Sequence, residues 1–384
     1  MSAARTQGMG APPSGAGRFG TWPRGAPASS ELDGSRGPAP RALPRLGFLG
    51  VGWIGQNRLE AVARSGKAEI ACVVDSSLGR ARDARCSCRD AAYSDDPALL
   101  FEADLDGVVI ATPSALHAEQ CLAFLSRGMA VFCQKPLGRN AAETAAVVRE
   151  ARLRDRLLGT DLCYRHVRGM REMRDLVRSG ALGRPVLVDA VFHNAYGPDK
   201  PWFYDPARAG GGCLMDLGIH LLDLSAWLLD FPDPRRVTSR LHAKGERLHG
   251  RRDRVEDQAL VEIDLASGAV IRIACSWNLP AGQDAVIGLS VFGTEGGAAW
   301  TNRNGSFYDF TVERFRGTSR ETLAEPSRDW QGAAVTNWAT RLARSPRFDE
   351  EAERLTNVAE LLDLAYEADG DAAGLEPRGT TSRT

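Results

Sequence analysis

Lysine is scarce in this chain of 384 residues. Only four lysines accompany 44 arginines, and one of them, Lys135, lies in "VFCQKPLG" (131–138). Arginine keeps its proton in proteins, whereas lysine is a compact donor whose pKa responds to burial and to neighbouring charge. A composition skewed towards arginine leaves a few lysines anywhere, and Lys67 in "RSGKAE" is typical of these. Lys135 is therefore a candidate that other features have to support.

Several further features are missing. The chain has no run of roughly 18 apolar residues, as a membrane span requires, and no N-terminal apolar core followed by a cleavage site. The 48 basic residues oppose 49 acidic ones, and no basic run is interleaved with aromatic residues. These absences argue against a membrane or nucleic-acid partner. We expect a small-molecule partner and a cytoplasmic protein.

The eight cysteines do not form a pattern typical of metal sites. Most lie in apolar runs, where a thiol behaves as a small hydrophobic group. Cys86 and Cys88 form a C-x-C pair without a second pair at zinc-finger spacing. We expect reduced cysteines and no bound metal.

The length predicts two domains flanked by loose ends. Residues 1–44 contain eight glycines and seven prolines with almost no apolar periodicity, so we expect them to be disordered. The tail 370–384 is similar. In residues 45–160, apolar strands such as "RLGFLG" and "DGVVIATPS" alternate with helical segments of 10 to 15 residues, which predicts an α/β Rossmann domain with a parallel sheet.

Residues 161–369 change pattern. Longer alternating strands such as "RPVLVDAVFH" and "DQALVEIDL" predict an α+β domain with a large, mostly antiparallel, open sheet. The "ASGA" turn predicts a hairpin within it, and "EEAERLTNVAELLDLAYEA" predicts a closing amphipathic helix.

A glycine-rich turn follows the first strand and begins the first helix. In G-x-G-x-x-G the first glycine permits the tight turn, the second lets the backbone approach a pyrophosphate, and the third allows close helix packing. The anion then faces the helix N-terminus. The residues of this turn that we expect at the cofactor are Gly50, Gly52, Trp53, Ile54 and Gly55.

Asp75 ends the second strand, 20 residues after Gly55. Such a carboxylate accepts hydrogen bonds from the ribose hydroxyls of NAD. It repels a 2′-phosphate by roughly 4 kcal/mol at about 4 Å and an effective dielectric near 20. NAD is therefore favoured, and NADP stays possible if Arg80 reaches the phosphate. The alternative interpretations are a helix cap for Asp75 and a solvated charge for Arg80.

A second signal is "GGGCLMDLGIHLLDLSAWLLD". Asp216, His220 and Asp223 have the spacing i, i+4 and i+7, which predicts one face of a helix whose other positions are almost all apolar. Burying charged groups costs free energy, so such groups are expected to be paired or to have a functional role. A His–Asp hydrogen bond inside a domain interface would also explain the spacing.

The turn, "ATPSALH", "QKP" and "GGGCLMDLGIH", in this order, resemble the glucose-fructose oxidoreductase, inositol dehydrogenase and MocA family over about residues 45–369. The resemblance implies a Rossmann domain followed by an open antiparallel sheet for substrate binding and oligomer contacts. It also implies oxidation or reduction of a secondary hydroxyl of a sugar or cyclitol with nicotinamide. The family typically has E-K-P, so Gln134 replaces a carboxylate; its amide can still bond a ribose hydroxyl.

The resemblance implies that Lys135 acts with Asp216 and His220 across the domain cleft. Neutral His220 suits the general base, which needs a pKa near working pH. Asp216 could orient the imidazole, and Lys135 could polarise the substrate oxygen. Tyr164 is the reserve acid or base, since some members of the family use a tyrosine.

The same comparison places further residues in the site. Thr112, Pro113, His117, Gln134 and Lys135 are expected along the cofactor, although His117 could equally be a helix-surface histidine. On the substrate side we expect Asp216 and His220 with Arg165, His193 and Asn194. Residues 202–204 ("WFY") are expected in a substrate-side loop, with core packing or an oligomer contact as the alternative.

These observations predict an NAD(P)-dependent oxidoreductase of a sugar, amino sugar or inositol. A dihydrodiol dehydrogenase-like enzyme and a non-catalytic NAD-sensing regulator are the alternatives. A metal-dependent variant would need His193, Asp216 and His220 to converge. Through the C-terminal sheet, the resemblance implies a homodimer or homotetramer.

Overall fold

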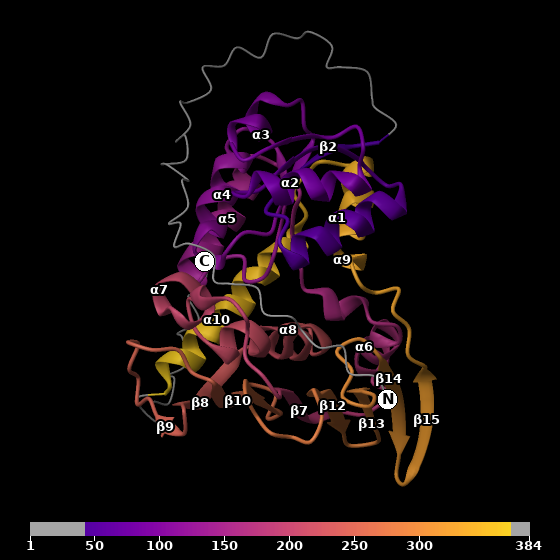
Figure 1. Cartoon of the computed structure of the whole chain (residues 1–384). Helices are drawn as coiled ribbons and strands as arrows, with labels where there is room; N and C mark the ends of the chain where they lie inside the picture. Colours follow the sequence, from indigo (N-terminus) through magenta and orange to yellow (C-terminus); the bar gives the residue numbers. More distant parts are fainter. Residues whose placement is uncertain (1–42, 370–384) are drawn as a thin grey trace, which may run out of the picture.

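The computed structural model describes residues 43–369. It contains two sheets, one above the other in Figure 1, with helices on both faces of the first sheet and on one face of the second. The segments that the sequence predicts to be disordered, 1–44 and 370–384, lie outside the described residues apart from residues 43 and 44. No helix among residues 43–369 is both long and apolar enough to cross a bilayer.

The first sheet is wholly parallel, with the strand order β3-β2-β1-β4-β5-β6. Its strands are short, and the three central ones, β1, β4 and β5, are almost completely buried because helices cover both faces. This is the predicted Rossmann arrangement, in which ligands bind beyond the carboxyl ends of the strands. The strands are β1 (Arg45–Leu49), β2 (Glu69–Val74), β3 (Ala92–Ser94), β4 (Gly107–Ile110), β5 (Ala130–Cys133) and β6 (Leu158–Thr160). The helices between them are α1 (Trp53–Ser65), α2 (Leu78–Ala84), η1 (Arg85–Ser87), α3 (Ala98–Glu102), α4 (Ser114–Leu125) and α5 (Ala141–Leu153).

The second sheet has nine strands in the order β15-β14-β13-β12-β7-β11-β10-β8-β9. Only β7 and β11 pair in parallel, so the predicted mostly antiparallel sheet is confirmed. The "ASGA" turn joins β10 to β11 as expected. The strands are β7 (Pro185–Asn194), β8 (Pro234–Ala243), β9 (Glu246–Arg247), β10 (Gln258–Leu265), β11 (Val270–Ser276), β12 (Ala285–Gly293), β13 (Gly297–Asn302), β14 (Phe310–Arg316) and β15 (Ser319–Ala324).

One face of the second sheet is covered and the other is open. In β10, buried residues alternate with exposed or half-buried ones, as expected for a strand that has a core on one side only. The covering elements include α8, which is buried along its whole length. The helices and turns around this sheet are η2 (Cys163–His166), α6 (Met170–Arg178), η3 (Pro201–Tyr204), α7 (Pro206–Ala209), the π-helical turn η4 (Leu214–Gly218) and α8 (Ile219–Leu228).

The chain returns to the first sheet after β15. Helix α9 (Ala333–Arg344) packs beside α1 (Figure 1), and its Trp338 is buried against Phe132 of β5. The ring fits where Gly107 and Gly159 have no side chain, since a Cβ at either position would come within 2.8 Å of it. No sequence pattern described above predicts this helix. The domain boundary at residue 160 stays a prediction. The core of the first domain also includes residues of α9, so this domain is not made of residues 45–160 alone.

Helix α10 (Arg354–Glu367) then crosses from one domain to the other, as Figure 1 shows in yellow. It follows the short turn η5 (Glu350–Glu353) and contacts both α5 and α8. The predicted closing helix is therefore confirmed. It packs against both domains and so helps to fix their relative position.

Candidate functional site

One large cleft, of about 1060 Å³, lies between the two domains. It is lined by the glycine-rich turn and strand ends of the first sheet on one side, and by η3, η4, α8 and loops of the second sheet on the other. A cleft of this kind between domains is a typical place for a cofactor and a substrate.

The glycine-rich turn has the geometry that its three glycines predict. Gly50 has a φ of +84°, which favours glycine, and a Cβ there would lie 2.7 Å from the Ala111 carbonyl oxygen. At Gly55 a Cβ would lie 2.1 Å from the Gly50 oxygen, so α1 could not pack so closely. Around Gly52, by contrast, nothing lies within 4 Å of the Cβ position.

Helix α1 begins at this turn without a side-chain cap and without an acidic residue in its first turn. Its free backbone N–H groups and the positive end of its dipole can therefore bind an anion. Together with the open space at Gly52, this fits the pyrophosphate of a dinucleotide.

Asp75 is held under the same turn. Its Oδ2 accepts a hydrogen bond from the Val51 N–H at 2.9 Å, while its Oδ1 accepts from Nε and Nη2 of Arg80 at 3.0 and 2.7 Å. The Arg80 side chain is 55 % exposed, yet it is paired with Asp75 rather than fully solvated. Arg80 therefore compensates much of the charge by which Asp75 would repel a 2′-phosphate.

Lys135 and Asp216 meet across the cleft. The Lys135 ammonium donates to the Asp216 carboxylate and to the Asp216 backbone carbonyl, both at 2.6 Å. The other carboxylate oxygen accepts from Trp277 Nε1 at 3.2 Å. Both side chains of the ion pair keep nearly a fifth of their surface exposed. An ammonium has three donors, so one is left for a ligand oxygen.

The glycines of "GGG" place Asp216 there. A Cβ at Gly212 would lie 1.8 Å from the Glu256 carbonyl oxygen, and one at Gly211 would lie 1.9 Å from the Tyr366 hydroxyl. The buried Glu256 carboxylate accepts from the N–H groups of Gly212 and Leu214 and from that hydroxyl. This carboxylate caps the turn η4 that carries Asp216, as an acidic group at a helix N-terminus does.

His220 follows one turn later on α8 and lines the cleft with only 7 % of its surface exposed. Its ring lies edge-on to Tyr164, with centroids 4.9 Å apart. Burial, with the nearby cations Lys135 and Arg58, lowers the pKa of His220 well below its ordinary value. The imidazole is therefore neutral. The expected hydrogen bond between Asp216 and His220 is not formed; the Asp216 carboxylate binds Lys135 and Trp277 instead.

Tyr164 is buried among aromatic rings of the second domain, including Phe192 and Trp300, and it lines the cleft. Burial raises the pKa of its hydroxyl well above the ordinary value. Tyr164 can therefore donate a proton but not accept one at neutral pH.

Two of the substrate residues expected from the sequence do not line this cleft. Arg165 pairs with Asp223 at 2.5 and 2.9 Å and lies over the rings of Trp227 and Phe231. This ion pair also explains the third polar position of the α8 pattern. His193 bonds Ser276 Oγ instead, because neighbouring residues of β7 point to opposite faces and it is Phe192 and Asn194 that face the cleft.

The residues expected along the cofactor form a linked edge of the cleft. His117 is buried, and its ring nitrogens lie 2.6 and 2.8 Å from the carbonyl oxygens of Pro136 and Thr112. It therefore joins the loop after β4 to the loop after β5 and is not a helix-surface histidine. Burial lowers its pKa despite these two acceptors. Pro113 lines the same edge.

Gln134 belongs to a buried group that the sequence analysis missed. Its amide donates to the Asp161 carboxylate, which also pairs with Arg58 of α1. Asp161 follows β6, and a polar residue at the carboxyl end of a parallel strand was a usable signal. No sequence signal pointed to Arg58, since an arginine inside a helix usually faces solvent. An amide rather than a carboxylate at 134 suits a neighbour that is already anionic.

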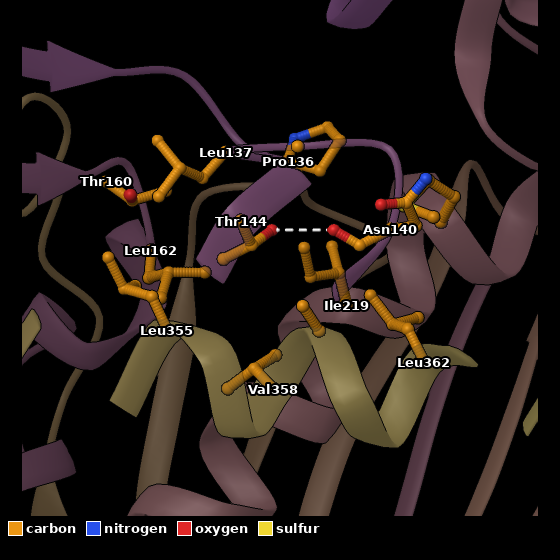
Figure 2. A pocket seen from close by; sticks show the side chains of 13 residues that line it. Pro136, Leu137, Asn140, Thr144, Thr160, Leu162, Ile219, Leu355, Val358 and Leu362 are labelled. Carbon is orange, nitrogen blue, oxygen red and sulfur yellow. Dashed lines mark hydrogen bonds between the residues drawn. The ribbon is translucent and has the colours of Figure 1, made fainter. Parts of the chain in front are cut away.

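A second, very small cavity of about 20 Å³ lies behind the loop that carries Lys135. Figure 2 shows it between that loop and α10, with leucine, isoleucine and valine side chains around it. Thr144 Oγ1 donates to the Asn140 carbonyl oxygen at its edge. The apolar side chains of α10 around this cavity therefore support the loop that carries Lys135 on the side away from the cleft. Within residues 43–369, no three or more His, Cys, Asp or Glu side chains are arranged to hold a metal ion.

Family models match most of the described chain. Residues 45–161 match the model "Oxidoreductase family, NAD-binding Rossmann fold", and residues 170–299 match "GFO/IDH/MocA C-terminal domain". The two matches fall on the first sheet with its helices and on the larger part of the second.

Curated relatives and solved structures agree with these models. Inositol 2-dehydrogenase 3 of Saccharopolyspora erythraea is 30 % identical over 62 % of this chain and 68 % of its own. The 1,5-anhydro-D-fructose reductase of Ensifer adhaerens is 28 % identical over 66 % of this chain and 74 % of its own. The structure of GenD2 from gentamicin A biosynthesis, in complex with NAD, has a TM-score of 0.74 at 24 % identity over 90 % of this chain and 99 % of its own. Levoglucosan dehydrogenase, in complex with NADH and levoglucosan, has a TM-score of 0.75 at 19 % identity over 88 % of this chain and all of its own.

The Asp75–Arg80 pair generates a prediction about the cofactor. Removing the guanidinium in Arg80→Ala leaves Asp75 uncompensated, so a 2′-phosphate meets a full like charge. We expect the Kd for NADP to rise by roughly tenfold or more, and that for NAD by less than threefold, at low salt. Calorimetry of both cofactors measures this, with the exposed Arg82→Ala as the matched control. An equal loss of both cofactors would contradict it.

Proposed function

The chain belongs to the GFO/IDH/MocA oxidoreductase family, and we propose that it is an NAD(P)-dependent dehydrogenase or reductase acting on a secondary hydroxyl or ketone of a sugar, amino sugar or inositol. The observation that carries the proposal is the Lys135–Asp216 contact in the cleft beside neutral His220. The cofactor supplies the hydride acceptor or donor, held by the turn of Gly50, Gly52 and Gly55. Three of the four proteins named above carry inositol or a sugar in their names, namely inositol 2-dehydrogenase 3, 1,5-anhydro-D-fructose reductase and levoglucosan dehydrogenase.

The side chains divide the work on the substrate as follows. Lys135 offers its third N–H to the reacting oxygen and stabilises the partial negative charge that develops there. Asp216 and Trp277 fix the position of that ammonium through the bonds described. His220 accepts the hydroxyl proton during oxidation and returns it during reduction. Tyr164, beside His220, is the reserve donor.

Lys135 gives the sharpest test. Lys135→Ala removes the charge at the reacting oxygen, and we expect kcat to fall by about 10²- to 10³-fold, with NAD affinity changed less than fivefold. Lys135→Arg is expected to recover little of this, since a planar fork replaces a compact donor. Absorbance of reduced nicotinamide with a polyol and sugar panel measures turnover, and Lys67→Ala, an exposed lysine, is the control.

Turnover that survives Lys135→Ala would refute the mechanism. A wild-type protein that binds NAD but never reduces it, on this panel or on one of cyclic diols, would favour the non-catalytic regulator. Turnover of cyclic diols alone would favour the dihydrodiol dehydrogenase-like enzyme.

The pH dependence separates His220 from Tyr164 as the base. A base whose pKa is lowered stays deprotonated as the pH falls, so kcat/KM for oxidation should stay level through pH 6.5, the ordinary value for histidine, and decline only below it. With Tyr164 as the base, the rate would instead keep rising beyond about pH 10, the ordinary value for tyrosine, because burial raises the pKa of this hydroxyl well above it. We expect His220→Gln to lower kcat by at least about 10²-fold and Tyr164→Phe to preserve the shape of the profile. The opposite result would assign the base to Tyr164.

We also propose a cytoplasmic homodimer or homotetramer that associates through the open face of the second sheet. The eight free cysteines suit a reducing compartment. Leu260 and Phe292 are apolar side chains on the open face of this sheet that stay exposed. Sedimentation of the purified protein is expected to give a dimer or tetramer, and Leu260→Asp is expected to weaken it. A monomer at micromolar concentration would overturn this proposal.

A further inference from the structure

The half of the cleft formed by the second domain is lined by several aromatic rings in addition to the polar groups around Lys135. One wall is Trp202 and Phe203, stacked with centroids 3.9 Å apart on the turn η3. Phe203 in turn contacts the ring of Trp277, which bonds Asp216. The wall is therefore continuous with the polar centre of the site.

A second aromatic group comes from other loops. Phe307 and Tyr308, between β13 and β14, line the cleft, and Phe307 lies 6.2 Å from the ring of Tyr196 after β7. The backbone of Tyr308 accepts a hydrogen bond from Trp330 Nε1, which fixes this loop. Tyr196 is half exposed, so these rings are not simply part of the core. Aromatic rings that line a cleft and are only partly buried are typical of a ligand contact.

The charges of this region limit what the ligand can be. Among the lining residues from 192 onward that the structure describes, Lys200 is the only lysine or arginine, and its partner is Asp199. Arg328, near the Tyr308 ring, is held by both carboxylate oxygens of Asp309. Phosphate and carboxylate groups are usually bound by free arginines or lysines. The part of the cleft lined by Trp202, Phe203, Phe307 and Tyr308 is here called the outer cleft. For a sugar phosphate or a nucleotide sugar it offers only Lys200 among these lining residues, and the neighbouring Asp199 carboxylate offsets that charge.

We propose that the outer cleft is a subsite for an uncharged apolar group attached to the reacting sugar, so that the substrate is a neutral glycoside with an aryl or similarly flat aglycone. The sugar ring lies at Lys135, Asp216 and His220, and the aglycone stacks against Trp202 and Phe203 with Phe307 and Tyr308 near it. The inference rests on the proposed function for the sugar end. The inference adds the chemical class of the group attached to the sugar and names the residues that would select it.

The test compares matched pairs of methyl and phenyl glycosides of several hexoses. Calorimetry on the NAD-saturated protein measures their binding, independently of turnover. We expect the phenyl member of at least one pair to bind roughly tenfold more tightly than the methyl member. Trp202→Ala and Tyr308→Ala should each remove most of that preference and change methyl glycoside binding less than twofold. Phe292→Ala, which removes a partly exposed ring on the far face of the sheet, should leave the preference intact.

Two outcomes would overturn the inference. One is equal affinity of the wild-type protein for both members of every pair, including no binding of either. The other is tighter binding of glucose 6-phosphate or UDP-glucose than of the phenyl glucoside. The proposed function is tested by a different measurement. It would be refuted if no polyol, sugar or glycoside gave nicotinamide reduction, whether or not these compounds bind. A phenyl preference without turnover would therefore support the subsite and refute the enzyme.

Discussion

The contact between Lys135 and Asp216 is the interaction on which the site depends. It joins the end of β5 in one domain to the turn η4 in the other, with two hydrogen bonds of 2.6 Å. An ammonium and a carboxylate that are mostly shielded from water need one another, since either alone would carry an uncompensated charge. The pair also explains why position 135 is a lysine in a chain whose basic residues are nearly all arginine. A guanidinium at 135 would have donors enough, but they lie in a wide planar fork, whereas the compact ammonium directs two N–H groups to Asp216 and its third to a single ligand oxygen.

The backbone around this contact is determined by glycine at two places. In the first domain Gly50 and Gly55 let the chain turn tightly while Gly52 leaves space, and in the second Gly211 and Gly212 let Tyr366 and Glu256 approach η4. In both places a helix begins at the cleft. In the first its N-terminus is left uncapped, and in the second a buried carboxylate satisfies it. One end is open to an external anion and the other already has an internal one.

The fold could be read from the sequence because its signals are local. Strand–turn–helix order, the glycine spacing and alternation in strands such as β10 need no knowledge of distant contacts, and they correctly predicted a parallel first sheet and a mostly antiparallel second sheet. The meeting of Lys135 with Asp216 came from the family resemblance, not from spacing. What failed involves long-range partners. Arg165 lay next to Tyr164 in the sequence, but only the fold reveals that Asp223 holds it, and no local pattern could have placed Arg58 against Asp161 or Trp338 against β5.

The return of α9 to the first sheet has a consequence for how this protein can be divided. The groove above Gly107 and Gly159 is filled by Trp338, which is synthesised almost 180 residues after the last strand of that sheet. A fragment ending at β6 would present this groove to water as an unfilled apolar slot. The nucleotide-binding part is thus not a cassette that recombination or cloning can exchange intact, and a functional graft has to carry the distant helix with it.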